Sequence, residues 1–184
     1  MKRRQFLEAT GAASTAGIAV LAGCSGGSGG SDGGGGGTAT PTPKPTETNT
    51  IGMVTEGSEY YFDPIGLYVE PGETVTWRIE SGAHSTTAYK KGNSLASVTR
   101  IPSGAEAWNS GTLSSEGATF EHTFETEGTY DYFCIPHKAL GMIGRVVVGE
   151  PGGPAEGSMP PDGEVPTSDT IVQEGAVSYD AFTG

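Results

Sequence analysis

The sequence contains little of several residue types, and each scarcity narrows what the chain can be. Its 184 residues include 10 Lys and Arg against 22 Asp and Glu, two cysteines and three histidines. No basic cluster is present to meet phosphates, so we expect no nucleic-acid partner. The N-terminal apolar run is too short and too rich in glycine to fill about 30 Å of hydrocarbon, which argues against an uncleaved membrane anchor.

The excess of acidic residues is not concentrated in one part of the sequence. Without the first 23 residues, seven basic residues remain against 21 acidic ones, a net charge of −14, and the acids are scattered along the chain. A scattered excess favours solubility through charge repulsion at very high salt, as in a halophile, over attraction of a basic partner.

The N-terminus has the pattern of an export signal. Lys2, Arg3 and Arg4 precede an uncharged, mildly apolar stretch that ends in Leu-Ala-Gly-Cys at Cys24. We interpret residues 1–23 as a twin-arginine lipoprotein signal peptide, with lipid attached to the thiol of Cys24. The mature chain would then be lipid-anchored at the extracytoplasmic face of the cell membrane.

A tether follows the lipidation motif. Residues 25–48 hold nine glycines and three prolines and almost nothing apolar, so residues 24–49 form a Gly/Thr/Pro-rich linker that cannot bury a core and is expected to be disordered. In an exported chain, two cysteines also suggest a Cys24–Cys134 disulfide. If Cys24 is lipidated, Cys134 is instead a lone thiol that a metal would protect from oxidation.

Residues 50–149 have the pattern of an all-β domain. Apolar and polar residues alternate over 74–80 and 119–125, Tyr130, Tyr132 and Cys134 share one strand face, and residues 145–148 are rich in valine. Short strands separated by Gly and Pro turns predict a two-sheet sandwich. Residues 92–117 are less regular and predict a long connection with one helical turn near 105–109.

Three metal-ligand side chains lie within nine positions of one loop. In YFCIPHKALGMIG, Cys134 ends a strand, and His137 and Met142 follow before the next strand begins. A fourth ligand is expected from His84, which follows the strand through Trp77. Two histidines, a thiolate and a weak axial methionine are the ligands of a mononuclear type 1 (blue) copper site. The absence of a second cysteine in the loop argues against a dinuclear copper centre.

The stretch YDYFCIPHKALGMIGRVVV resembles the plastocyanin-like cupredoxins and, together with the export signal, is most similar to archaeal halocyanins. The resemblance implies a cupredoxin-like Greek-key β-sandwich over residues 50–149 that binds copper through His84, Cys134, His137 and Met142. It also implies that Ser85, which stands where many plastocyanins have asparagine, braces the cysteine loop less well.

The implied function is carriage of single electrons by Cu(I)/Cu(II) cycling between redox partner proteins of the membrane electron-transport chain, with no enzymatic activity. Pro136 and Leu140 form a possible docking surface beside His137, with Leu140 exposed and Ile135 packed inward. The main alternative is an extracytoplasmic copper storage or delivery protein. A zinc site or a cysteine hydrolase fits less well, because methionine is a poor zinc ligand and no third group orients His137 as a base.

Two other regions receive weaker interpretations. His122 alternates with phenylalanines and is expected to be a partly buried strand residue rather than a ligand. Residues 150–184 read as an acidic, Pro/Gly-rich, disordered tail, although TIVQEGAVSYDAFTG contains strand-forming residues. An alternative hypothesis is that this segment adds a strand to an exposed sheet edge.

Overall fold

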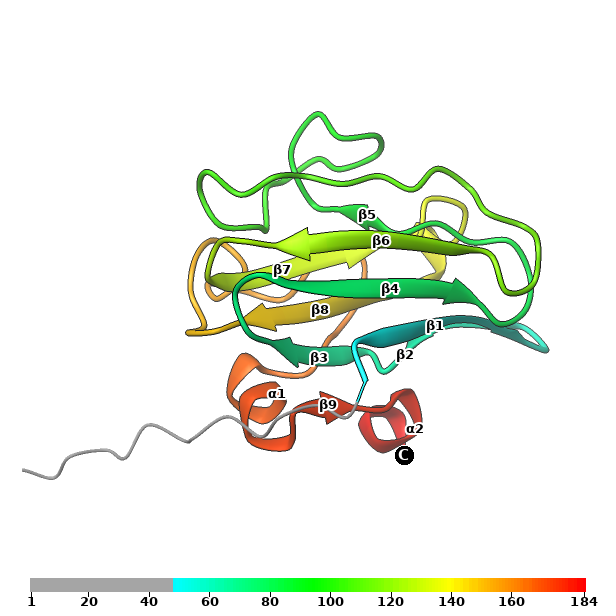
Figure 1. Ribbon diagram of the computed structural model, residues 1–184. Coiled ribbons are helices and arrows are strands. Elements are labelled where there is room, and N and C mark those ends of the chain that lie inside the picture. The colour runs from blue at the N-terminus through cyan, green and yellow to red at the C-terminus, as the bar shows by residue number, and fades with distance from the viewer. Residues whose placement is uncertain (1–47) are drawn as a thin grey trace, which may run out of the picture. The chain divides into compact units, whose positions relative to one another are not determined.

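The structure, a computed structural model, describes residues 48–184, and these form a sandwich of two β-sheets (Figure 1). The first sheet has the order β2-β1-β4-β6. Its strands are β1 (Thr50–Glu56), β2 (Glu59–Asp63), β4 (Glu73–Ile79) and β6 (Thr119–Phe124). The second sheet has the order β5-β7-β8-β3-β9. Its strands are β5 (Thr87–Ala88), β7 (Gly128–Phe133), β8 (Ile143–Val148), β3 (Gly66–Val69) and β9 (Ala176–Val177).

The connectivity is that of a Greek-key sandwich. The chain changes sheets between β2 and β3 and at each later connection until β7. As a result, β1 pairs with β4 in parallel and β3 pairs with β8 in parallel, whereas β7 and β8 form an antiparallel hairpin. The predicted all-β sandwich is therefore confirmed.

Alternation in the sequence places the core between the two sheets. In β4, Val75, Trp77 and Ile79 are buried and the residues between them are partly or fully exposed. Trp77 lies at the centre, with its ring 5.5 Å from that of Trp108 and 5.4 Å from that of Tyr132. Fully burying side chains of this size provides about 1.5–3 kcal/mol each, so these rings contribute much of the attraction between the sheets.

The prediction of a helical turn near residues 105–109 is wrong. This part of the connection runs extended beside β5, where the Ala88 N–H donates to the Trp108 carbonyl at 3.1 Å and Thr87 forms a bridge with Asn109. The Trp108 indole also donates to the Thr86 hydroxyl at 2.9 Å. Pairing with β5 satisfies the backbone groups that a helical turn would have satisfied internally.

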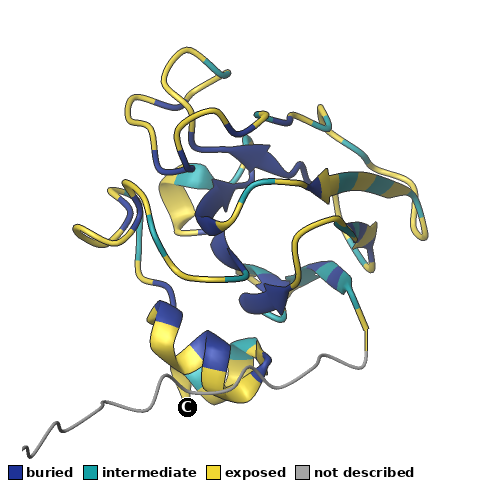
Figure 2. Cartoon of the chain, turned by 60° about the vertical axis from the view of Figure 1, so that its left-hand side comes forward, coloured by how far each residue is buried: buried dark blue, intermediate teal, exposed yellow. Residues whose placement is uncertain are grey.

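Residues 150–184 are folded, so their interpretation as a disordered tail is wrong. They contain α1 (Ser168–Glu174), β9 and α2 (Tyr179–Thr183), and β9 pairs antiparallel with β3 at the edge of the second sheet. The added-strand hypothesis is confirmed. Figure 2 shows that the helices turn an exposed side outward and a partly buried side toward the strands.

The C-terminal segment explains why the central strands do not alternate. Every residue of β7 and β8 is buried, because each strand is covered on both faces. On the outer face of the second sheet, Ile171 and Val172 of α1 pack with Tyr68 and Val147. A strand covered on both faces needs no polar alternation.

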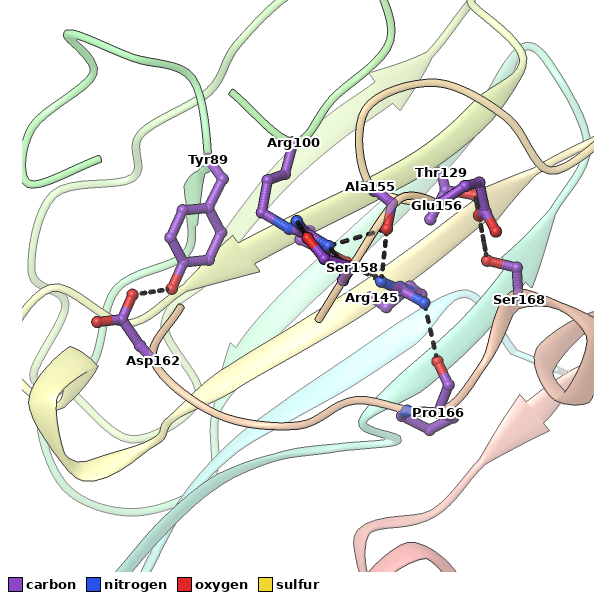
Figure 3. A network of polar contacts seen from close by, with 11 residues as sticks. Tyr89, Arg100, Thr129, Arg145, Ala155, Glu156, Ser158, Asp162, Pro166 and Ser168 are labelled. Atoms are coloured by element: carbon purple, nitrogen blue, oxygen red, sulfur yellow. Dashed lines mark hydrogen bonds and ion pairs between the residues drawn. The ribbon is translucent and has the colours of Figure 1, made fainter. Parts of the chain in front are cut away.

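A buried charge network joins the C-terminal segment to the sandwich (Figure 3). Asp131 of β7 accepts from the Nε atoms of Arg100 at 2.6 Å and Arg145 at 2.8 Å, and all three residues are at most 5% exposed. One carboxylate facing two guanidinium groups leaves a positive charge that needs further acceptors. The backbone carbonyls of Ala155, Ser158 and Pro166 supply them.

Deleting residues 150–184 should therefore destabilise the whole domain. The deletion removes the carbonyl acceptors from two buried arginines, and each hydrogen bond to a charged group contributes about 1.5–3 kcal/mol. We expect the melting temperature, followed by circular dichroism, to fall by about 10 °C or more. A change below about 2 °C would show that the segment is not part of the cooperative fold.

His122 should make stability depend on pH. It is a half-buried residue of β6 stacked on Trp108, with ring centroids 4.7 Å apart, as expected for a strand residue. Burial lowers its pKa, and Glu106 opposes this only in part. Below pH about 6.5 the unfolded chain binds the proton more readily than the folded one, so this contribution to stability is lost as pH falls.

The test compares the wild-type protein with His122→Phe, which retains an aromatic ring against Trp108. From pH 8 to pH 5 the melting temperature of the wild type should fall by more than that of the variant. His84 and His137 are present in both proteins, so their titration cancels in the comparison. Parallel pH profiles would contradict the assignment.

Candidate metal centre

The loop from Cys134 to Met142 is closed by its own backbone. Cys134 follows β7, and its N–H donates to the Met142 carbonyl at 3.0 Å. The His137 carbonyl accepts from the N–H groups of Leu140 at 2.9 Å and Met142 at 3.2 Å. The short 3-10 helix η1 (Lys138–Leu140) directly follows His137. It is capped by Gly141, whose φ of 85° favours glycine. The loop thereby returns directly to β8.

His84 reaches this loop from a distant part of the sequence. It follows β4 and is held by a two-way bridge, in which its N–H donates to Leu113 O at 2.9 Å and its carbonyl accepts from Leu113 N–H at 2.7 Å. The next residue, Ser85, donates its N–H to the Cys134 sulfur at 3.4 Å. These contacts place His84 against Cys134, 50 positions later in the chain.

Three donor atoms converge at one point. The Cys134 Sγ lies 3.7 Å from His84 Nδ1 and 3.5 Å from His137 Nδ1, and the two Nδ1 atoms are 3.2 Å apart. With metal–nitrogen bonds of about 2.0 Å, a metal–sulfur bond of about 2.3 Å and angles near about 120°, the donors would lie about 3.5–3.7 Å apart. The observed triangle fits one transition-metal ion. In the part of the chain that the structure describes, it is the one cluster of this kind.

Hydrogen bonds fix which nitrogen of His84 faces the triangle. Its Nε2 lies 2.9 Å from the Ser81 carbonyl, which can only accept, and 2.9 Å from Thr55 Oγ1. Nε2 therefore carries the proton and Nδ1 offers its lone pair to a metal. This carbonyl is the kind of outer partner that orients a ligating histidine.

Burial acts differently on the two imidazoles and on the thiol. It lowers the pKa of His84, with the neighbouring His137 adding to the effect and the Ser81 hydrogen bond opposing it, and it lowers the pKa of His137. Both imidazoles are thus neutral at pH 7. Burial raises the pKa of the Cys134 thiol, although N–H groups of Ser85 and His137 oppose this shift. Metal binding would displace the thiol proton, since the thiolate is the ligand.

The Ser85 side chain braces the cysteine loop with a hydrogen bond. Its hydroxyl accepts from the Ile135 N–H at 2.7 Å, directly beyond Cys134. The expectation that a side chain shorter than asparagine braces the loop less well stays a prediction. Because His84 and Ser85 are both completely buried, the brace is protected from water.

Tyr60 is a neighbour of the site that the sequence did not reveal. Its ring, from β2, stacks on His137 with centroids 3.9 Å apart and an angle of 17° between the planes. Nothing in the strand sequence EYYFD distinguishes it from Tyr61, which stacks instead on Tyr179. The stack restricts rotation of the His137 ring.

The four residues singled out in the sequence are thus gathered at one end of the sandwich. Met142 is completely buried and hydrogen-bonded through its backbone to both Cys134 and His137. The four form a type 1 pattern, two imidazoles and a thiolate with a methionine, and a donor set of mixed softness suits copper in both oxidation states. Cys134 is a free thiol. Residues 1–23, Cys24 and most of the linker lie outside the described residues.

The fold and the donor set together define a cupredoxin domain. Residues 50–149 match the family model for copper binding proteins of the plastocyanin/azurin family, and the chain belongs to that family. The cofactor is accordingly copper, and the resemblance found in the sequence is confirmed.

The chain is also similar to several individual proteins. The chain is 34% identical over 173 residues to a halocyanin of Natronomonas pharaonis, covering 80% of this chain and 98% of the relative. It is 30% identical over 102 residues to a plastocyanin of Scenedesmus fuscus, covering 54% of this chain and 97% of the relative. A solved pseudoazurin from Sinorhizobium covers 68% of this chain and 87% of that chain, at 24% identity and a TM-score of 0.48.

Substitutions of Cys134 and Met142 should have different effects on the copper centre. In copper-loaded protein, Cys134→Ser should abolish the intense visible absorption, because the thiolate is the origin of the charge transfer to Cu(II). Met142→Leu should keep the colour and raise the reduction potential, since loss of the axial sulfur mainly disfavours Cu(II). Spectrophotometry and voltammetry measure the two effects. A colourless Met142→Leu protein that still binds copper would contradict the axial role.

Proposed function

We propose that this cupredoxin is a lipid-anchored carrier of single electrons at the extracytoplasmic face of the cell membrane, not an enzyme. Its partners would be redox proteins of the membrane electron-transport chain. The export signal and the Leu-Ala-Gly-Cys motif at Cys24 support the location. Bound copper supplies the chemistry by alternating between Cu(I) and Cu(II).

No helix in residues 48–184 is long and apolar enough to span a bilayer. The proposed attachment to the membrane therefore rests on the N-terminal motif.

The observation that carries the proposal is the unequal burial of the donors. His84, Cys134 and Met142 are completely buried, whereas His137 is only partly buried. The closed donors exclude water and substrates from the metal. His137 offers the shortest route from the metal to the surface, which suits passage of an electron.

Exposed apolar residues beside His137 support the docking surface expected from the sequence. Leu140 is 65% exposed, and Pro136 and Ala139 are also exposed. Ile135 packs inward against the cluster that contains Phe133. At molar ionic strength charge steering is screened within about 3 Å, so an apolar patch suits a weak encounter at high salt.

Storage or delivery of copper is the second candidate function. Those tasks require a partner or chelator to reach the metal, and open sites serve them best. Here two of the three clustered donors have no exposed surface, and the thiolate is held by the Ser85 N–H as well. The closed geometry therefore favours electron transfer over release of the ion.

Leu140→Glu should leave the visible spectrum intact and slow electron exchange with membranes of the source organism about tenfold or more, the equivalent of roughly 1.4 kcal/mol. A charge at the centre of the patch would have to be desolvated on docking. Stopped-flow exchange at several salt concentrations measures the effect.

The matched control is Leu95→Glu, which makes the same change at another leucine, 59% exposed and outside the copper loop. It should exchange electrons at the wild-type rate. Equal slowing in both variants would assign the effect to net charge, and an unaffected rate for Leu140→Glu would show that partners dock elsewhere.

A further inference from the structure

The C-terminal segment reaches the copper loop as well as the charge network. Asp162 lies between Ser158 and Pro166, and its Oδ2 is 2.6 Å from the Nζ of Lys138, the residue that follows His137. The same oxygen accepts from the Tyr89 hydroxyl at 2.5 Å, a contact shown in Figure 3. One carboxylate therefore ties the copper loop to the residue that follows β5.

This ion pair is largely withdrawn from water. The side chains of Lys138 and Asp162 are 15% and 20% exposed. The Lys138 ammonium also lies over two aromatic rings, 5.6 Å from the centroid of Tyr89 and 5.4 Å from that of Phe133, which directly precedes Cys134. Ion pairs on open surfaces contribute about 0–1 kcal/mol because water competes for both ions. Here the rings exclude much of that water and hold the ammonium in one position.

The backbone of the segment is pressed against the same loop. A Cβ added to Gly163 would lie 3.6 Å from the Gly141 Cα and 3.1 Å from the Ile143 Cδ1. A Cβ added to Gly141 would lie 3.7 Å from the Asp162 carbonyl. Residues 162 and 163 thus contact both ends of the turn that separates His137 from Met142.

We propose that Asp162 is a positioning residue for the copper centre, acting through Lys138 to hold His137. The turn over Lys138–Leu140 has no buried residue of its own, so core packing does not anchor it. Asp162 provides an anchor at its first residue, and Gly163 packs against Gly141, directly after its last. The inference rests on the copper centre and is independent of which proteins exchange electrons with it.

The consequence is that the ligand loop keeps its geometry with and without the metal. A ligand set that stays in place when the charge of the ion changes needs little rearrangement during electron transfer. If Asp162 is neutralised, Lys138 loses its partner and turns toward water, and His137 gains freedom to leave the triangle.

The test uses Asp162→Asn in the full chain, with Glu164→Gln as the matched control. Glu164 is an exposed carboxylate two residues further along the same segment, so the control removes the same charge without touching the loop. Two quantities are measured: amide hydrogen exchange of residues 138–142 in the copper-free protein, and the rate at which loaded protein loses copper to a chelator.

We expect Asp162→Asn to accelerate both processes about tenfold or more and Glu164→Gln to change them by less than about twofold. Amides of β4 and β6 should exchange at the wild-type rate in both variants. An unchanged loop in Asp162→Asn would overturn the proposal. Equal acceleration throughout the domain would also overturn it, because the role would then be general stability.

A double-mutant cycle adds a second line of test. If Asp162 acts through Lys138, then Lys138→Gln should reproduce the faster loop exchange, and the double variant should be no faster than either single variant. Additive effects would show that the two side chains act separately. Lys138→Gln by itself also keeps the proposal testable if Asp162→Asn folds poorly.

Discussion

The central constraint on this structure is that two imidazole nitrogens and one sulfur are held in a triangle that fits one metal ion. The Nδ1 atoms of His84 and His137 lie 3.2 Å apart, and the Cys134 sulfur lies within 3.7 Å of both. The sandwich maintains this arrangement from outside the triangle. Ser81 fixes one ring, Tyr60 stacks on the other, and Ser85 secures the thiol. The sandwich therefore holds these three donors together as well as burying apolar surface.

The functional unit is larger than the segment that matches the family. Residues 50–149 contain the metal donors, but the carbonyls of the C-terminal segment complete the solvation of Arg100 and Arg145. The same segment provides β9 for the sheet edge. One segment thus provides hydrogen-bond acceptors for a buried charge and pairs with an exposed sheet edge. An unsatisfied buried charge and an unpaired edge would each destabilise a sandwich.

The sequence predicted the local parts of this arrangement well. Alternation placed β4 and β6, and the close spacing of Cys134, His137 and Met142 indicated a shared loop. His84 could be added because it follows a strand that had already been placed. Interactions between distant segments could not be read in this way. The meeting of Arg100 with Asp131, and of Asp162 with Lys138, depends on how far apart segments pack, and no local pattern encodes it. The extended course of residues 105–109 likewise follows from a neighbouring strand that overrides local helical preference.

The buried arginines also impose an order on biosynthesis. Arg100, Asp131 and Arg145 are synthesised before Ala155, Ser158 and Pro166, whose carbonyls accept from the two arginines. A nascent chain that already contains every residue of the metal triangle therefore still has guanidinium groups that only water can solvate. Closing the sandwich at that stage would bury charge without its acceptors, so the domain gains its full stability only after those later residues have been added. The copper centre should consequently mature on a completed chain and not during its elongation.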